Sequence, residues 1–133
     1  MLNDMTYITF HCRYGQLSIH RGCIEKMGKP VYIQILVNPE VKQLLLRISD
    51  EQQKNSFAVS ERLYSAKADF GINGVEMVEK FRKLMGWKKQ CAYRVEGTLI
   101  DNHMMHFKLD TATGSDDWND DSEEAEECLI SID

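Results

Sequence analysis

The sequence predicts an α+β fold with a mostly antiparallel sheet built from hairpins, one short helix and one long helix. Three observations support this prediction. Apolar and polar residues alternate with a period of two near both ends of residues 1–110, as strands with one buried face require. Turn-prone residues join neighbouring alternating segments, as they do in β-hairpins. Residues 74–85 instead have the apolar spacing of an amphipathic helix.

The first predicted hairpin covers residues 6–20 and turns near Gly15. Its inward-facing apolar residues are Ile8, Phe10, Cys12, Leu17 and Ile19. A short helix is expected over about residues 21–27, with Gly28 as the left-handed residue that ends it. Pro30 prevents the helix from continuing, because proline has no backbone N–H to donate.

A second hairpin is predicted from two alternating segments, 31–37 and 42–48. Residues 38–40, Asn-Pro-Glu, have the composition of the turn between them. Residues 50–56 are polar and are expected to form a loop. The pattern of 57–64 fits either a strand or a helix, and we assign it as a strand.

The long helix is predicted over residues 74–85. Asn73 stands where a capping residue belongs, and Glu76 follows three residues later, as in a capping box. Gly86 is expected to end the helix. The apolar stripe that would face the core consists of Val78, Phe81, Leu84 and Met85.

A final hairpin is predicted from residues 91–101 and 104–110, around the turn-prone sequence Asp-Asn-His. We expect the first and last hairpins to share one sheet, with the long helix covering one face. Residues 1–110 would then form one compact domain of ordinary size.

The charged residues divide the chain into two parts. Residues 1–110 hold all 16 Lys and Arg and 12 of the Asp and Glu, which gives a net charge near +4. Residues 111–133 hold the other nine acids and no Lys or Arg, a net charge near −9. Such an asymmetry is typical of a body that binds polyanions, or of a tail that competes for them. A weakly charged body with a solubilising tail fits equally well.

Residues 111–133 are predicted to be a disordered acidic tail, because they contain too few apolar residues to offset the entropy of ordering. The chain nevertheless ends in an apolar tip that contains Leu129, Ile130 and Ile132. This tip would dock onto a partner protein, fold back as an edge strand of its own sheet, or have no role.

Several classes of protein are disfavoured by the composition. No stretch has the roughly 18 to 20 apolar residues of a membrane span, and the first ten residues do not resemble a secretory signal. The four cysteines, at positions 12, 23, 91 and 128, have wide and irregular spacings. We therefore expect reduced cysteines and a cytoplasmic protein.

No catalytic residue, cofactor or metal is predicted. The sequence lacks a GxSxG elbow, a GxxxxGK[ST] loop and a GxGxxG loop. His20 with Cys23, and His103 with His106, have spacings that zinc ligands can use, but ordinary strand histidines and core thiols explain them better. The protein is therefore not predicted to be an enzyme.

Basic residues on the first hairpin form the candidate nucleic-acid-binding site. His11, Arg13 and His20 are expected on its polar face, with Arg21 just beyond. Lys and Arg contacts to phosphate provide most of the affinity for nucleic acids. A second cationic cluster, at the end of the long helix, surrounds Trp87, which we interpret as a core residue rather than a platform for stacked bases. Its members are Arg82, Lys83, Lys88 and Lys89.

Residues 6–48 resemble the AbrB-type swapped-hairpin domains, a family of transition-state regulators and antitoxins. In that family a strand leads to a glycine, then to alternating apolar residues, a basic position, a short helix and Leu-Gly. The matching positions here are Gly15, Leu17, Ile19, Arg21, Met27 and Gly28. The sequence departs from the pattern at His20, where the family has proline, and it lacks the usual Gly-Asp before the third strand.

The resemblance implies a homodimer of interleaved hairpins in which Arg13 and Arg21 contact DNA. Antitoxins of this family similarly join a DNA-binding hairpin domain to an acidic, disordered tail that wraps a toxin. The function predicted first is therefore DNA binding or regulation through the first hairpin. The alternative is a protein-interaction module, antitoxin-like or adaptor-like, whose acidic tail binds a basic protein partner.

Overall fold

The computed structural model describes residues 6–49, 56–66, 69–101 and 103–115. The helices of this part are α1 (Arg21–Lys26), α2 (Glu61–Ala66) and α3 (Val75–Met85), with a 3-10 turn over Leu109–Thr111. Its strands are β1 (Tyr7–His11), β2 (Gln16–Ile19), β3 (Tyr32–Asn38), β4 (Gln43–Ser49), β5 (Ser56–Ala58), β6 (Phe70–Asn73), β7 (Ala92–Asp101), β8 (Met104–Lys108) and β9 (Thr113–Ser115). The predicted α+β fold is confirmed.

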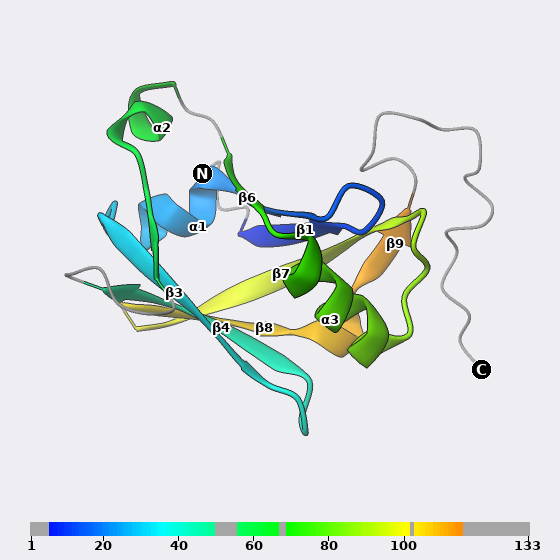
Figure 1. Cartoon of the computed structure of the whole chain (residues 1–133). Coiled ribbons are helices and arrows are strands. Elements are labelled where there is room, and N and C mark those ends of the chain that lie inside the picture. The colour runs from blue at the N-terminus through cyan, green and yellow to red at the C-terminus, as the bar shows by residue number, and fades with distance from the viewer. Residues whose placement is uncertain (1–5, 50–55, 67–68, 102, 116–133) are drawn as a thin grey trace.

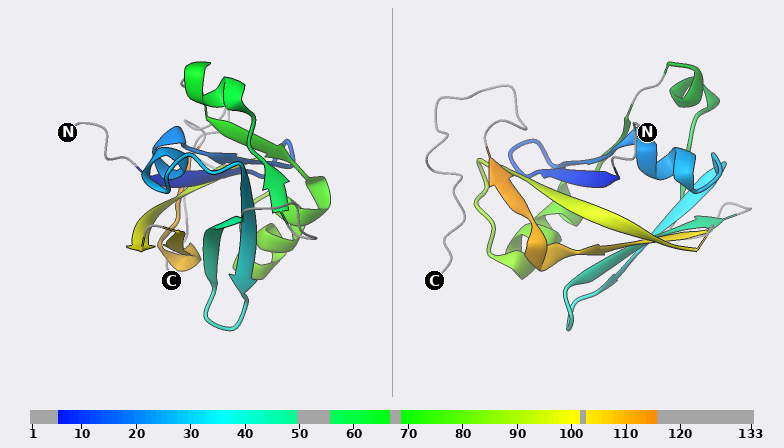
Figure 2. Two further views of the ribbon diagram at one scale, coloured as in Figure 1. Left: turned by 90° about the vertical axis from the view of Figure 1, so that its left-hand side faces the viewer. Right: turned by 180° about the vertical axis from the view of Figure 1, so that it is seen from behind.

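The nine described strands form one sheet that curls into a half-barrel (Figure 1). The order is β5-β3-β4-β8-β7-β1-β2-β6, and every pairing is antiparallel. β7 joins the two parts of the sheet, and Figure 2 shows it passing from one part to the other. Its first half pairs with β1 and β9, and its second half pairs with β8. The first and last hairpins therefore share one sheet, as expected.

The chain builds this sheet from two halves of similar design. β1, β2, α1, β3 and β4 make the first half, and β5, β6, α3, β7 and β8 make the second, with α2 inserted after β5. By order along the chain, β1 corresponds to β5, β2 to β6, β3 to β7 and β4 to β8. β2 pairs with β6, and β4 pairs with β8. The pair of β1 with β7 corresponds to the pair of β5 with β3. Met27 and Gly28 follow α1, and Met85 and Gly86 stand at the end of α3. Gly28 and Gly86 have φ values of 92° and 70°. The pairing pattern is that of an approximate twofold relation between the halves.

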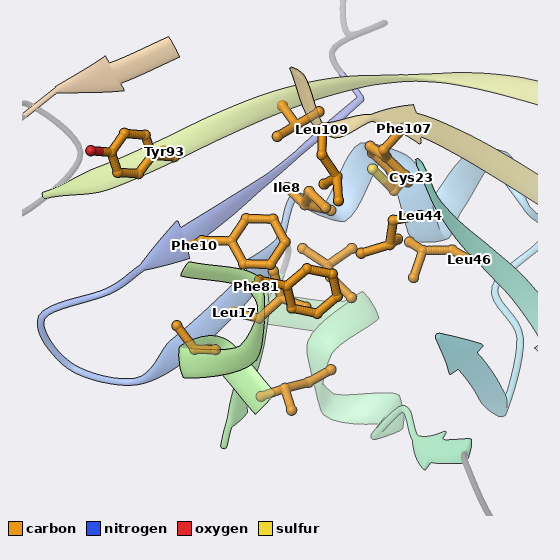
Figure 3. Close-up of a cluster of buried hydrophobic side chains, with 14 of the residues drawn as sticks. Ile8, Phe10, Leu17, Cys23, Leu44, Leu46, Phe81, Tyr93, Phe107 and Leu109 are labelled. Carbon is orange, nitrogen blue, oxygen red and sulfur yellow. The ribbon is translucent and has the colours of Figure 1, made fainter. Parts of the chain in front are cut away.

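The core lies inside the half-barrel and is closed on one side by α3 (Figure 3). The ring of Phe81 on α3 lies 4.9 Å from that of Phe10 on β1. Trp87 follows α3, lies 5.1 Å from Phe10, and stacks on Tyr93 at 4.6 Å with an interplanar angle of 9°. Trp87 is 7% exposed, so its interpretation as a core residue is confirmed.

Three local expectations were wrong. Only residues 57 and 58 of the ambiguous segment lie in a strand. α2 begins at Glu61, where Ser60 Oγ accepts a hydrogen bond from Arg62 N–H at 3.2 Å. β6 and β9 were not expected, since strands of three or four residues are too short to show a period. Asn73 does not cap α3. It ends β6, where its side-chain Oδ1 accepts a hydrogen bond from Gln16 Nε2 at 3.3 Å.

The body also extends beyond residue 110, the expected boundary of the tail. Leu109–Thr111 forms the 3-10 turn, and β9 then pairs with Ala92–Arg94 at the start of β7. One threonine, one glycine and one serine gave no signal for this strand, because backbone pairing with β7 creates it. Residues 116–133, with the predicted apolar tip, lie outside the described residues.

The cysteines differ from one another in their bonding. Cys12 and Cys23 are free and buried, whereas Cys91 is disulfide-bonded. The expectation of reduced cysteines is therefore wrong for Cys91, because spacing along the chain does not reveal which side chains meet in space.

None of the helices in the described part of the chain is long and apolar enough to cross a membrane.

Candidate functional site

An apolar groove lies between α3 and the region where β3 and β5 meet. Its volume is about 510 Å³, which is in the range of sites that bind ligands. One wall is a face of α3, and the other comes from β3, the turn after it, and β5. The lining residues are Ile35, Val37, Pro39, Ser56, Phe57, Met77, Lys80, Phe81 and Leu84.

The helical wall follows from the spacing of residues along α3. Met77, Phe81 and Leu84 recur at intervals of four and three residues, so their side chains lie on one face of the helix. Phe81 is 6% exposed and anchors the helix in the core, while Met77 and Leu84 are half-buried. The core therefore covers only part of the apolar stripe of α3. The half-buried part, Met77 and Leu84, lines the groove.

The ends of α3 are held by backbone hydrogen bonds. Before the helix, Gly74 N–H donates to Gly15 O at 2.9 Å, which ties the helix start to the turn between β1 and β2. After it, Gly86 adopts the left-handed conformation and Trp87 N–H donates to Arg82 O at 3.0 Å. The wall of the groove is thus attached to the core at both ends.

The strand wall is the part of β3 that extends beyond its described pairing with β5. Among the described residues, β5 pairs only with Tyr32–Gln34 of β3. Beyond that point, Ile35 and Val37 of β3 face the groove, and Val37 is 46% exposed. An exposed apolar side chain on a strand offers a surface for a further apolar group.

Lys80 is the charged residue of the groove lining, and its side chain is exposed. Its ammonium group stands on the same helical face as Met77 and Leu84, beside apolar surface. Ser56 contributes the one hydroxyl group among the lining residues. The groove therefore offers apolar contact and one positive charge, which is the chemistry of a site that binds an apolar group carrying a negative charge.

Part of the predicted cationic cluster at the end of α3 is occupied by an ion-pair network. Glu79 Oε2 lies 3.0 Å from Arg82 Nε and 3.3 Å from Lys89 Nζ. The hydrogen bond from Arg82 lowers the pKa of Glu79 to about 2. Arg82 also donates from Nη1 to Trp87 O at 3.2 Å. Arg82 thus holds the chain after α3 in place, while Lys83 and Lys88 remain exposed.

The predicted nucleic-acid-binding residues lie on one hairpin but not in one patch. Arg13 is in the turn before β2 and Arg21 begins α1, so all of β2 separates them. His11 ends β1 opposite Gln16 and is half-buried. An acidic group also lies close by, since Arg21 N–H donates to Asp69 Oδ1 at 3.2 Å.

His20 has a structural role that the sequence did not reveal. It is the residue that caps α1, where its Nδ1 accepts a hydrogen bond from Gly22 N–H at 3.0 Å. Its ring also lies 4.4 Å from that of Tyr7. Arg94, on the neighbouring strand β7, also contacts this ring: its Cζ lies 3.9 Å from the centroid of the Tyr7 ring, in a cation–π contact.

A second cavity, of about 700 Å³, lies between α2 and the segment before β3. Tyr64 Oη donates to Pro30 O at 2.8 Å, and Lys29 Nζ lies 5.8 Å from the Tyr64 ring. Burial raises the pKa of Tyr64 to about 12. Glu61 and Arg62 also line this cavity, so it lacks the continuous apolar wall of the groove beside α3.

Sequence reasoning missed the groove because it assigned the whole apolar stripe of the long helix to the core. The available signal was Met77, which extends the stripe by one turn beyond Phe81. The strand wall gave a weaker signal, because the sequence alone does not distinguish an exposed valine such as Val37 from a buried one.

No family model matches the chain, and no curated protein or solved structure matches it either. The resemblance of residues 6–48 to the swapped-hairpin family therefore stays a prediction. Among the described residues, no group of three or more His, Cys, Asp or Glu side chains is placed to hold a metal ion.

Proposed function

We propose that this protein is a protein-interaction module that binds an apolar, acid-bearing peptide segment in the groove beside α3. The observation that carries the proposal is the combination of a 510 Å³ apolar groove with Lys80 in its lining. The walls are a helix face and the end of a strand, which are surfaces that apolar peptide segments commonly bind. Apolar burial would supply the affinity, and Lys80 would select for a nearby carboxylate.

The test uses two lysines of the same helix. Lys80 lines the groove, whereas Lys83 is exposed on α3 and does not line it. The probe is a short peptide that alternates Glu with Leu and Ile, titrated to millimolar concentration into the labelled full-length protein and followed by NMR. Its control peptide has Ser in place of Leu and Ile.

We expect saturable binding of the apolar peptide only, with shifts at Met77 and Leu84. Lys80→Glu should weaken this binding about tenfold, because it places a carboxylate beside those of the peptide. Lys83→Glu should change it by less than about threefold, since an exposed charge farther away is screened. Equal effects of the two substitutions, or shifts that miss α3, would overturn the proposal.

DNA binding through the first hairpin is a second candidate, supported by the net positive charge of residues 1–110. If Arg13 and Arg21 contact phosphates, Arg13→Ala and Arg21→Ala should each lower the slope of log affinity against log salt by about one. Measured slopes equal to that of the unaltered protein would remove both residues from the interface.

A further inference from the structure

We propose that the disulfide of Cys91 fastens the acidic residues 116–127 as a loop over cations that would otherwise bind DNA, so that reduction uncovers them. The inference rests on the second candidate function, DNA binding, and does not involve the groove. The chain has four cysteines, of which Cys12 and Cys23 are free and Cys91 is bonded. Within one chain, the partner of Cys91 is therefore Cys128.

Both ends of the acidic segment are then held at the start of β7. Ser115, the residue before the segment, ends β9 and is paired with Ala92. Cys128 follows the segment and is joined to Cys91, the neighbour of Ala92. Residues 116–127 thus form a closed loop instead of a free tail. Half of an extended chain of this length measures about 20 Å, which limits how far the loop reaches from its ends.

Cationic residues from two parts of the sequence meet beside these attachments. Cys91 O accepts a hydrogen bond from Cys12 N–H at 3.2 Å, which brings the following residue, Arg13, next to the start of β7. Cys91 N–H donates to Lys88 O at 3.3 Å, and Lys89 is the next residue. Figures 1 and 2 show the β1–β2 turn, the loop after α3 and β9 at the same end of the molecule. Cations of the first hairpin and of the long helix are therefore neighbours in space.

The loop and this surface carry opposite charges. Residues 116–127 contain eight acids and no Lys or Arg. The cations of the surface are three exposed lysines and one half-buried arginine, namely Lys83, Lys88, Lys89 and Arg13. Glu79 lies 3.3 Å from Lys89 Nζ and offsets part of their charge. The loop therefore carries more than enough negative charge to neutralise this surface, as the phosphates of DNA would.

The disulfide keeps the acids concentrated at the surface. A segment tied at both ends stays within reach of the cations, whereas a segment tied at one end spreads over a larger volume and has a lower effective concentration. Reduction breaks the S–S bond: a dithiol donates two electrons and two protons, is oxidised to its own disulfide, and leaves Cys91 and Cys128 as thiols. The released segment then competes less strongly with DNA.

Peptide mapping tests the pairing itself. The full-length protein, purified in air, is alkylated in denaturant without reductant, digested and analysed by mass spectrometry. We expect one disulfide-linked pair of peptides, with Cys91 in one and Cys128 in the other, and alkylated Cys12 and Cys23. A link from Cys91 to another cysteine, or four alkylated cysteines, would overturn the proposal.

The affinity for a short DNA duplex tests whether the loop covers the cations. Fluorescence anisotropy at low salt measures binding of the full-length protein before and after treatment with dithiothreitol. We expect reduction to tighten binding at least about fivefold, because the competing acids become less concentrated. C128S should bind as tightly as the reduced protein and should not respond to dithiothreitol, since its acidic segment is already tied at one end only.

Two variants of the full-length protein separate the charge of the loop from its chain. E123Q/E124Q/E126Q/E127Q removes four of the eight acids, and E123D/E124D/E126D/E127D keeps their charge. In the oxidised state the Gln variant should bind the duplex at least about fivefold more tightly than the unaltered protein. The Asp variant should respond to dithiothreitol as the unaltered protein does.

The covered surface is tested by K88E/K89E in C128S, which should weaken DNA binding about tenfold because it reverses two of the cations. An effect below about threefold would place DNA binding elsewhere and overturn the covered surface. Equal affinity of the oxidised and reduced proteins would overturn the cover and leave DNA binding in place. Absence of binding by the reduced protein at low salt would overturn the second candidate function together with the cover.

Discussion

The two free thiols show how burial controls the chemistry of single residues. Cys12 and Cys23 are 3% and 0% exposed, and burial raises the pKa of each thiol to about 12. Arg82 lowers the pKa of Cys12 in part, and a contact with the Tyr7 backbone lowers that of Cys23 in part. Neither contact overcomes the loss of solvation, so both residues remain neutral thiols at physiological pH.

The folded protein should protect these two thiols from Ellman's reagent at pH 8. The reagent reacts with thiolates, and a thiol with a pKa near 12 forms almost none at that pH. Absorbance at saturation should show both thiols only after denaturant is added. Rapid labelling of the native protein at either position would contradict the burial that the structure shows.

The same shift predicts how stability depends on alkaline pH. An unfolded thiol titrates near 9.0, below the folded value of about 12, so the unfolded state releases its protons first as the pH rises. The free energy of unfolding should therefore be insensitive to these groups below about pH 8 and fall between about pH 9 and 12. Urea denaturation across this range, compared with C12A/C23A, measures the contribution. An unchanged slope in the double variant would contradict it.

At the scale of elements, β7 is the strand that allows one sheet to enclose the core. It exchanges partners midway, from β1 and β9 to β8, and Gly97 lies at this point opposite Phe107. A Cβ atom at Gly97 would lie 2.7 Å from Phe107 Cζ and 2.8 Å from Cδ2. The ring thus occupies the space that a side chain on β7 would otherwise fill, which lets Phe107 reach the core fully buried.

Gly97→Ala should destabilise the protein by about 1–3 kcal/mol, because the added methyl group overlaps the Phe107 ring in a packed core. Urea denaturation followed by circular dichroism measures the loss. The matched variant G97A/F107L has a smaller side chain at the contact and should lose less relative to F107L alone. If Gly97→Ala unfolds at the same urea concentration as the unaltered protein, the close approach of Phe107 is wrong.

At the scale of the whole molecule, the two halves are interlocked rather than placed side by side. The pairings β1 with β7, β2 with β6, β3 with β5, and β4 with β8 all cross from one half to the other. Neither half therefore completes its own sheet or core. One chain supplies both halves, so these strands find their partners without a second copy.

Separate fragments of residues 1–52 and 53–133 should each lack cooperative structure, because every described strand except β9 would lose a neighbour from the other half. Mixed in equal amounts, they should recover the circular dichroism spectrum of the intact protein, and the intact chain should unfold in one transition by far- and near-ultraviolet signals. A cooperative thermal transition of either fragment alone would show that the halves are independent.

The sequence by itself determined the fold class, the paired hairpins at 31–48 and 91–110, and the long helix. Each of these follows from local periodicity over seven or more residues. Glycines such as Gly28 and Gly86 also mark the ends of helices, because glycine adopts a positive φ more readily than other residues do. It also identified Trp87 as a core residue. It failed at short elements, since β6 and β9 exist because a neighbour offers them unpaired backbone groups.

Only the tertiary structure decided where functional surface lies. Ile35 and Val37 of β3 and Met77 and Leu84 of α3 are distant in sequence and carry no motif. They form a groove because the fold places α3 opposite this part of β3. Arg13 and Arg21 are close in sequence, yet β2 separates them. A local pattern records which side of an element is apolar, whereas what covers that side depends on partners that the chain brings from elsewhere.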